Sequence, residues 1–167
     1  MPDRSSPLWP TRTEIFFRDR QFEPQLQEGP TCVATVLGML TGQEAGVFVG
    51  RVNTQDPRAW SAALAPSGLR LAYCPTDARK LEFYREELID LDDLFTLSYY
   101  TPDDPAQIFQ DPDQEGWVCG SHVVLLHRHR ILDPASGLAL PFEEHPCVGK
   151  HTKRIFRVVP AGDGRAL

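Results

Sequence analysis

The amino-acid sequence predicts a single α+β domain. Patterns typical of helices occur mainly in the first half of the chain, and strand patterns gather in the second half. Helices followed by a run of neighbouring strands favour an antiparallel sheet with helices packed on it over a parallel α/β sheet. At 167 residues, the chain is long enough to bury a hydrophobic core within one domain.

The clearest helix pattern begins at Cys32. Apolar residues there recur at intervals of three and four, which places them on one helical face: Val33, Val36, Leu37 and Leu40. Thr31 fits an N-cap and Gly42 a C-terminal stop, so we expect a helix over residues 32–40. Gly38 lowers helix propensity, which suggests that another segment approaches the helix closely at this position.

The remaining elements follow in order along the chain. A second helix is expected over residues 56–65, with Asp56 as its cap and Pro57 in its first turn. A third, more charged helix is expected over residues 77–88. Strands are expected at residues 69–73, 94–100, 117–127, 130–133 and 154–159.

These elements place the domain at residues 21–160. Residues 1–20 are rich in Pro and Arg and read as an N-terminal arm, in which Glu14–Arg18 could add an edge strand. Residues 161–167 are expected to form a flexible tail.

Composition excludes several classes of function. The net charge of −6 and the lack of a basic stripe argue against binding nucleic acid or an anionic membrane. No apolar run approaches the roughly 18 residues of a membrane span, and the N-terminus lacks the apolar stretch of a secretion signal. We therefore expect a cytoplasmic protein whose cysteines are thiols. No Gly-rich phosphate loop is present, and we expect no cofactor.

Cys32 is the candidate nucleophile, because the expected helix begins at this residue. Unpaired N–H groups and the positive end of the helix dipole lower the pKa of a thiol at that position, and the thiolate is the reactive form. The alternative is that Cys32 is a small buried hydrophobic residue in the first turn of the helix.

His122 and Asp133 are the candidate partners of this thiol. With a turn centred between His127 and Arg128, the strands around it would pair His122 directly with Asp133. Directly opposed residues have Cβ atoms about 4.5–5.5 Å apart on one face, which lets an acid hold an imidazole in one tautomer. A turn with an odd number of residues would separate the pair. The alternatives are a core histidine and a turn aspartate before Pro134.

Together these residues resemble the papain-like cysteine peptidase superfamily, nearest to compact bacterial members such as the peptidases that trim double-glycine leader peptides. The matching residues are Gln27, Gly29, Cys32, His122 and Asp133, and the likeness covers about a quarter of the chain. The family's glutamine usually lies six residues before the cysteine. Gln27 lies five residues before Cys32 and Gln25 seven, so both are candidates for its role.

The resemblance implies a papain-like fold, in which a helix with the cysteine packs on an antiparallel sheet with the histidine and the acid. It implies a Cys32–His122–Asp133 triad, an oxyanion donor at Gln27 or Gln25, and a peptide or protein substrate. Four further residues would flank the substrate cleft: Gly29, Trp117, Gly120 and Ser121. The same triad could deamidate glutamine or transfer acyl groups, and a non-catalytic binding domain could keep the fold.

Two further patterns have alternative interpretations. Cys119, His122, His145 and Cys147 have the atom types of a zinc site, with His127, His129 and His151 nearby, although their spacing fits no recognised ligand pattern. Five acidic residues precede the His122 strand, and they could favour a basic substrate or form a solvated loop: Asp103, Asp104, Asp111, Asp113 and Glu115.

Overall fold

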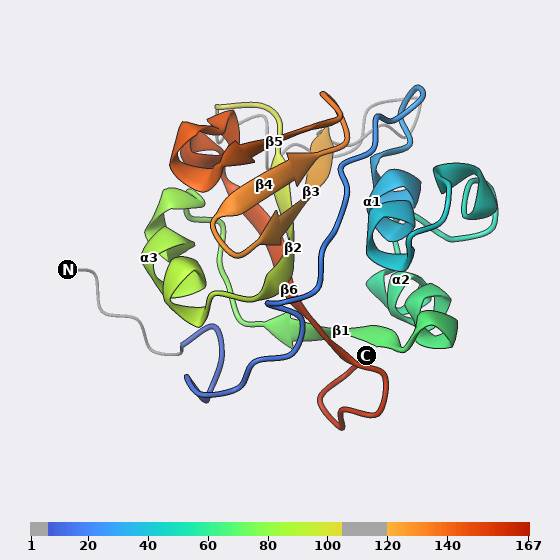
Figure 1. Cartoon of the computed structure of the whole chain (residues 1–167). Helices are drawn as coiled ribbons and strands as arrows, with labels where there is room; N and C mark the ends of the chain where they lie inside the picture. Colours follow the sequence, from blue (N-terminus) through green and yellow to red (C-terminus); the bar gives the residue numbers. More distant parts are fainter. Residues whose placement is uncertain (1–6, 105–119) are drawn as a thin grey trace.

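A six-stranded antiparallel sheet forms the centre of the protein (Figure 1). The computed structural model describes residues 7–104 and 120–167. The strands are β1 (Leu69–Cys74), β2 (Leu94–Tyr100), β3 (Ser121–His127), β4 (Arg130–Asp133), β5 (Leu138–Pro141) and β6 (Thr152–Pro160). They lie in the order β1-β6-β2-β3-β4-β5, so the predicted α+β class with an antiparallel sheet is confirmed.

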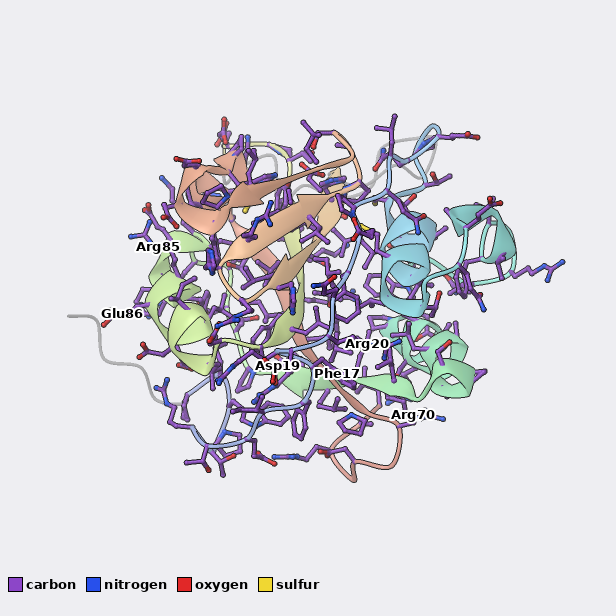
Figure 2. The ribbon with its side chains drawn as sticks, in the orientation of Figure 1. Phe17, Asp19, Arg20, Arg70, Arg85 and Glu86 are labelled. Atoms are coloured by element: carbon purple, nitrogen blue, oxygen red, sulfur yellow. The ribbon has the colours of Figure 1, made fainter. Side chains whose placement is uncertain are left out.

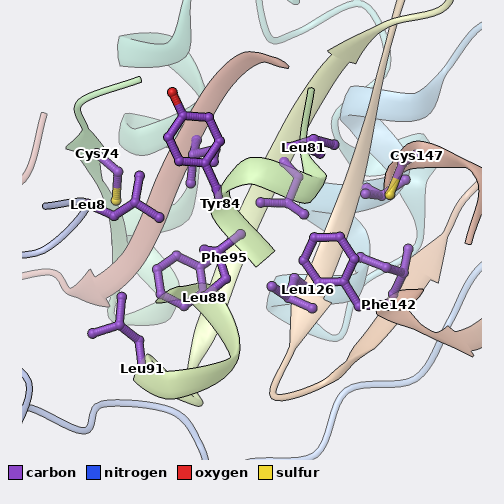
Figure 3. Packing of buried hydrophobic residues seen from close by; sticks show 14 of the residues in the cluster. Leu8, Cys74, Leu81, Tyr84, Leu88, Leu91, Phe95, Leu126, Phe142 and Cys147 are labelled. Carbon is purple, nitrogen blue, oxygen red and sulfur yellow. The ribbon is translucent and has the colours of Figure 1, made fainter. Parts of the chain in front are cut away.

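Helices cover both faces of this sheet. α1 (Cys32–Thr41) and α2 (Pro57–Leu64) lie on one side and α3 (Glu82–Leu91) on the other (Figure 1). Short 3-10 turns complete the described elements: η1 (Ala45–Val47), η2 (Ala65–Ser67), η3 (Phe142–Glu144) and η4 (Pro146–Gly149). Each face has its own buried apolar cluster, and Figure 3 shows Leu88 of α3 beside Phe95 of β2 in one of them.

None of the helices within the described residues is both long and apolar enough to cross a membrane.

The helix that begins at Cys32 forms as the sequence predicts. Gly42 ends α1 with a φ of 73°, a left-handed conformation that glycine adopts at little cost. A Cβ at Gly38 would lie 2.8 Å from the Gln43 carbonyl oxygen, which explains why glycine is needed there. Thr31 occupies the N-cap position, but its hydroxyl donates to the Glu28 carbonyl instead of capping the helix.

The hairpin between β3 and β4 differs in register from the prediction. His127 pairs with Arg130, which leaves a two-residue turn between them. The predicted direct pairing of His122 with Asp133 is wrong because the turn is centred one residue later than we placed it. Moving the turn by one residue shifts each pairing by two positions along the partner strand. Because side chains alternate with a period of two, His122 and Asp133 stay on one face as diagonal neighbours.

Two other elements depart from the sequence-based expectation. α3 begins at Glu82 instead of near residue 77, because the Asp77 carboxylate accepts the Arg79 N–H and the Tyr84 hydroxyl and holds a turn before the helix. Strand β5 was not expected at all. It is an edge strand of only four residues that ends in a proline, and its apolar residues do not alternate with polar ones as in a typical half-buried strand.

The N-terminal arm packs against the domain and forms no strand over Glu14–Arg18, so the expected edge strand is wrong. The N–H groups of Phe16 and Phe17 donate to the two carboxylate oxygens of Asp93, at 2.7 and 2.8 Å, and not to a neighbouring strand. Leu8 is buried in the α3-side core (Figure 3). Figure 2 shows Phe17, Asp19 and Arg20 along this segment.

A fully buried ion pair fastens this arm to the sheet. Arg157 of β6 and Asp93 are both 0% exposed, with Nη2 2.6 Å from Oδ2. The guanidinium also lies 4.8 Å from the ring centres of Trp9 and Phe16, and Nη2 donates to the Glu14 carbonyl. The arm therefore covers a charge pair that would otherwise face solvent at the sheet, and its backbone groups hydrogen-bond to both charged side chains.

Residues 161–167 are also packed, in contrast to the flexible tail that the sequence suggested. The Leu167 N–H donates to the Leu71 carbonyl at 2.8 Å, and Ala166 forms a bridge with Ala72 of β1. Arg165 makes two 2.7 Å bonds to the Glu14 carboxylate and thereby holds the pKa of that group well below its usual range. The two ends of the described chain thus support each other.

We expect Asp93→Asn to destabilise the fold by about 3–5 kcal/mol, because it leaves the buried Arg157 charge without its counter-charge. Urea unfolding followed by circular dichroism would measure this loss. Asp90→Asn is the matched control, since Asp90 is 68% exposed and its pair with Arg12 spans 4.0 Å. A variant at Asp93 as stable as the one at Asp90 would contradict the account of the arm.

Candidate active site

Cys32 is the first residue of α1, and its thiol lies at the edge of the sheet beside the beginning of β3. Strand β4 pairs with β3 only over residues 125–127, so it leaves the earlier part of β3 accessible to the helix. Burial opposes ionisation of Cys32, but a hydrogen bond with His122 and N–H donors from Val123 and Val33 favour it. The net effect lowers the pKa of the thiol below its ordinary value of 9.0.

His122, the second residue of β3, connects Cys32 to Asp133. Its Nε2 lies 2.8 Å from Asp133 Oδ1, which leaves Nδ1 as the ring nitrogen for the thiol. Burial lowers the basicity of the ring, but the bonds to Asp133 and Cys32 outweigh it and raise the pKa of His122 to about 9. Opposite shifts in a neighbouring thiol and imidazole favour a thiolate–imidazolium ion pair at neutral pH.

Asp133 ends β4 and accepts hydrogen bonds on both carboxylate oxygens. His122 and the Ala135 N–H donate to Oδ1, and His145 Nε2 lies 2.7 Å from Oδ2. Burial disfavours the charge, but the two histidines and the Ala135 N–H outweigh it and hold the pKa of the carboxyl well below its usual range. Asp133 is therefore a fixed anion that orients the His122 ring.

His145 is a member of this network that the sequence did not assign to it. The Cys147 N–H donates to His145 Nδ1 at 3.0 Å, so this nitrogen is an acceptor and the ring proton lies on Nε2, directed at Asp133. His145 caps η4 with this bond and is buried. The only sequence signal for His145 was its position before Pro146. That signal is weak, because a histidine before a short turn is a common surface feature.

An aromatic ring restrains His122 from the side. Tyr99 lies directly across from His122 in the β2–β3 ladder, with ring centres 5.7 Å apart and planes at 75°. Burial, together with the nearby Asp133 charge, raises the pKa of Tyr99, so its hydroxyl stays protonated. The edge-on contact limits rotation of the imidazole.

A cavity of about 650 Å³ opens at Cys32 and His122. The cavity-lining residues are Gln27, Pro30, Cys32, Val33, Thr54, Gln55, Trp60, Ser98, Gly120, Ser121, His122, Val123, Lys153 and Arg154. Gly120 and Ser121 thus lie where the sequence placed them, while Gly29 does not line the cavity and Trp117 lies outside the described residues. The tryptophan that lines it is Trp60 of α2, which has no recognisable motif around it.

The two glutamine candidates have different surroundings. Gln27 lines the cavity, and its Nε2 donates to the Gly29 carbonyl at 2.9 Å. Gln25 instead donates to the Gln43 carbonyl and lies against Gly38, two turns along α1 from Cys32. The backbone N–H of Gln27 also donates to the Pro134 carbonyl, which ties the segment before Cys32 to the residue after Asp133.

The sequence also suggested a zinc site as an alternative. Within residues 7–104 and 120–167, no group of three or more His, Cys, Asp or Glu side chains is arranged to hold a metal. Cys119 lies outside this part of the chain, as do three of the five acidic loop residues: Asp111, Asp113 and Glu115. Of the other two, Asp103 pairs with Lys150 at 2.7 Å.

Comparison of the chain with protein-family models, curated proteins and solved structures found no match.

We expect Cys32 to alkylate faster than Cys74, Cys119 and Cys147 at mildly acidic pH. Its lowered pKa leaves more thiolate there, whereas Cys74 is fully buried and burial raises the pKa of Cys147 to about 12. Peptide mapping after iodoacetamide treatment would report each site. His122→Ala should shift the rise of the Cys32 rate to higher pH, because the ring no longer stabilises the thiolate.

Uniformly slow labelling of all four cysteines would contradict an activated thiol. So would a rate for Cys32 that is unchanged by His122→Ala.

Proposed function

We propose that the chain is a thiol-dependent amide hydrolase of papain-like architecture, and in the first instance a cysteine peptidase. The observation that carries this proposal is the chain of contacts from Cys32 through His122 to Asp133, at the N-terminus of a helix and beside a cavity. A structural cysteine needs neither an imidazole partner nor access to a cavity. A thiol with both has the arrangement of an activated nucleophile.

The reaction would begin with attack of the Cys32 thiolate on a carbonyl carbon. The C–N bond then breaks as the His122 imidazolium gives its proton to the leaving amine, and a thioester to Cys32 remains. His122, now neutral, takes a proton from water as the water attacks the thioester. This step releases the acid and regenerates the thiolate–imidazolium pair. Asp133 holds the ring and stabilises its charged form throughout.

The developing oxyanion would receive hydrogen bonds from the backbone N–H of Cys32 and from Gln27. Gln27 is the better candidate of the two glutamines because it lines the cavity, whereas Gln25 is bonded at the other end of α1. Removing one such donor typically lowers the rate by about 10²–10³.

The same thioester chemistry serves glutamine deamidation, in which ammonia is the leaving group, and acyl transfer, in which another nucleophile replaces water. A papain-like domain that only binds peptides would keep the geometry and lack turnover. Peptides and proteins are the proposed substrates in each case.

Cys32→Ala is expected to abolish turnover and leave the fold intact, because Cys32 is only partly buried at the margin of the core and the change removes a single sulfur atom. Turnover of a peptide library, read by mass spectrometry, separates the reactions. Cleavage gives two fragments whose masses sum to the substrate plus one water, and deamidation leaves the chain intact.

Chelators should leave this activity unchanged. Loss of activity on metal removal, or full activity in Cys32→Ala, would contradict the proposal. Absence of any turnover by the wild-type protein would favour the binding domain.

A further inference from the structure

One wall of the cavity beside Cys32 is formed by two consecutive basic residues. Lys153 and Arg154 of β6 both line the cavity, although neighbours in a regular strand point to opposite faces. The ladder explains this: Ser98 pairs with Arg154 and Tyr99 with Thr152, which leaves Lys153 as the extra residue of a β-bulge. Bulges re-aim side chains in this way and are frequent beside active sites.

Arg154 has no counter-charge among the residues that the structure describes. No carboxylate belongs to the cavity lining within residues 7–104 and 120–167. In the same part of the chain, the partly buried residue Arg154 makes neither a hydrogen bond nor an ion pair, whereas Lys153 donates to the Ser121 hydroxyl at 3.3 Å. A cation held partly out of water without a counter-charge is costly unless a ligand supplies that counter-charge.

A second group on this wall also lacks a partner. Ser98 is only 4% exposed, lines the cavity, and its buried hydroxyl makes no hydrogen bond with any described residue. It lies directly across the ladder from Arg154. A residue with a hydroxyl donor and one with a planar fork of N–H donors are thus neighbours on one face and line the same cavity, which suits the two oxygens of a carboxylate.

We propose that this wall binds a carboxylate group of the substrate next to Cys32, with Arg154 as the main contact and Ser98 as a second donor. The carboxylate is either an acidic side chain or a free C-terminus. This inference rests on the proposed function, since it names the substrate class of the same site. It differs from the basic substrate that the acidic residues before β3 suggested.

Charged and neutral thiol reagents test the wall directly. Each anionic probe is compared with a neutral one of the same reactive group: iodoacetate with iodoacetamide, and 3-maleimidopropionate with N-ethylmaleimide. Peptide mapping measures the second-order rate constant of each reaction at Cys32. We expect the anionic member of at least one pair to be favoured, and Arg154→Gln to lower that preference about tenfold, the effect of one charge-assisted hydrogen bond. Arg154→Lys should restore part of the preference.

Arg85→Gln is the matched control, because Arg85 extends from α3 on the opposite side of the sheet (Figures 1 and 2). It removes the same charge and should leave the preference unchanged. Equal loss in Arg85→Gln and Arg154→Gln, or no loss in Arg154→Gln, would overturn the proposal. A Cys32 that reacts with no reagent would instead contradict the proposed function, so the two failures are distinguishable.

A second experiment, with peptide substrates, identifies whether the carboxylate comes from a side chain or from a C-terminus. Peptide libraries with free and amidated C-termini are treated with the wild-type protein and with Arg154→Gln. Cleavage beside acidic residues in both libraries supports a side-chain carboxylate, whereas activity confined to free C-termini supports a terminal one. Cleavage without any acidic or terminal preference in the wild-type protein would overturn the inference.

Discussion

The geometry of the site depends on the hydrogen bonds that the Asp133 carboxylate accepts. It binds two histidines, His122 at 2.8 Å and His145 at 2.7 Å, from different parts of the second half of the chain. The residue that follows it, Pro134, accepts the N–H of Gln27 from the segment before Cys32. Asp133 therefore lies between strand β3, which contains His122, and the segment that leads into α1, and its displacement would alter both.

Burial alone does not determine how the groups of this region ionise. Burial opposes ionisation of both the partly buried Cys32 and the fully buried Cys147, yet the pKa of Cys32 is lowered and that of Cys147 is raised to about 12. At Cys147 burial raises the pKa and the Asp133 anion raises it further, whereas at Cys32 the His122 imidazole and two N–H donors outweigh burial. The fold thus lowers the pKa of one thiol and raises that of another, which lies close to the Asp133 carboxylate.

Much of this site is visible in the sequence, because its main residues lie on elements with clear patterns. Helical periodicity places Cys32 at an N-terminus, and alternation in the β3–β4 hairpin keeps His122 and Asp133 on one face even though the predicted register was wrong. Other parts depend on contacts between distant segments. His145 precedes a short turn, and the bulge that turns Arg154 toward the cavity exists only through the pairing of β6 with β2. Local patterns carry no information about either.

The central claim is that Cys32 and His122 form an ion pair held by Asp133, and the direct measurement is the titration of the His122 ring by NMR. The account predicts a pKa of about 9 for His122 in the intact protein. It also predicts a clear fall in that pKa in Cys32→Ala, which removes the negative partner and leaves Asp133 in place. A His122 that titrates near the ordinary value of 6.5, or one unaffected by the loss of Cys32, would contradict the ion pair.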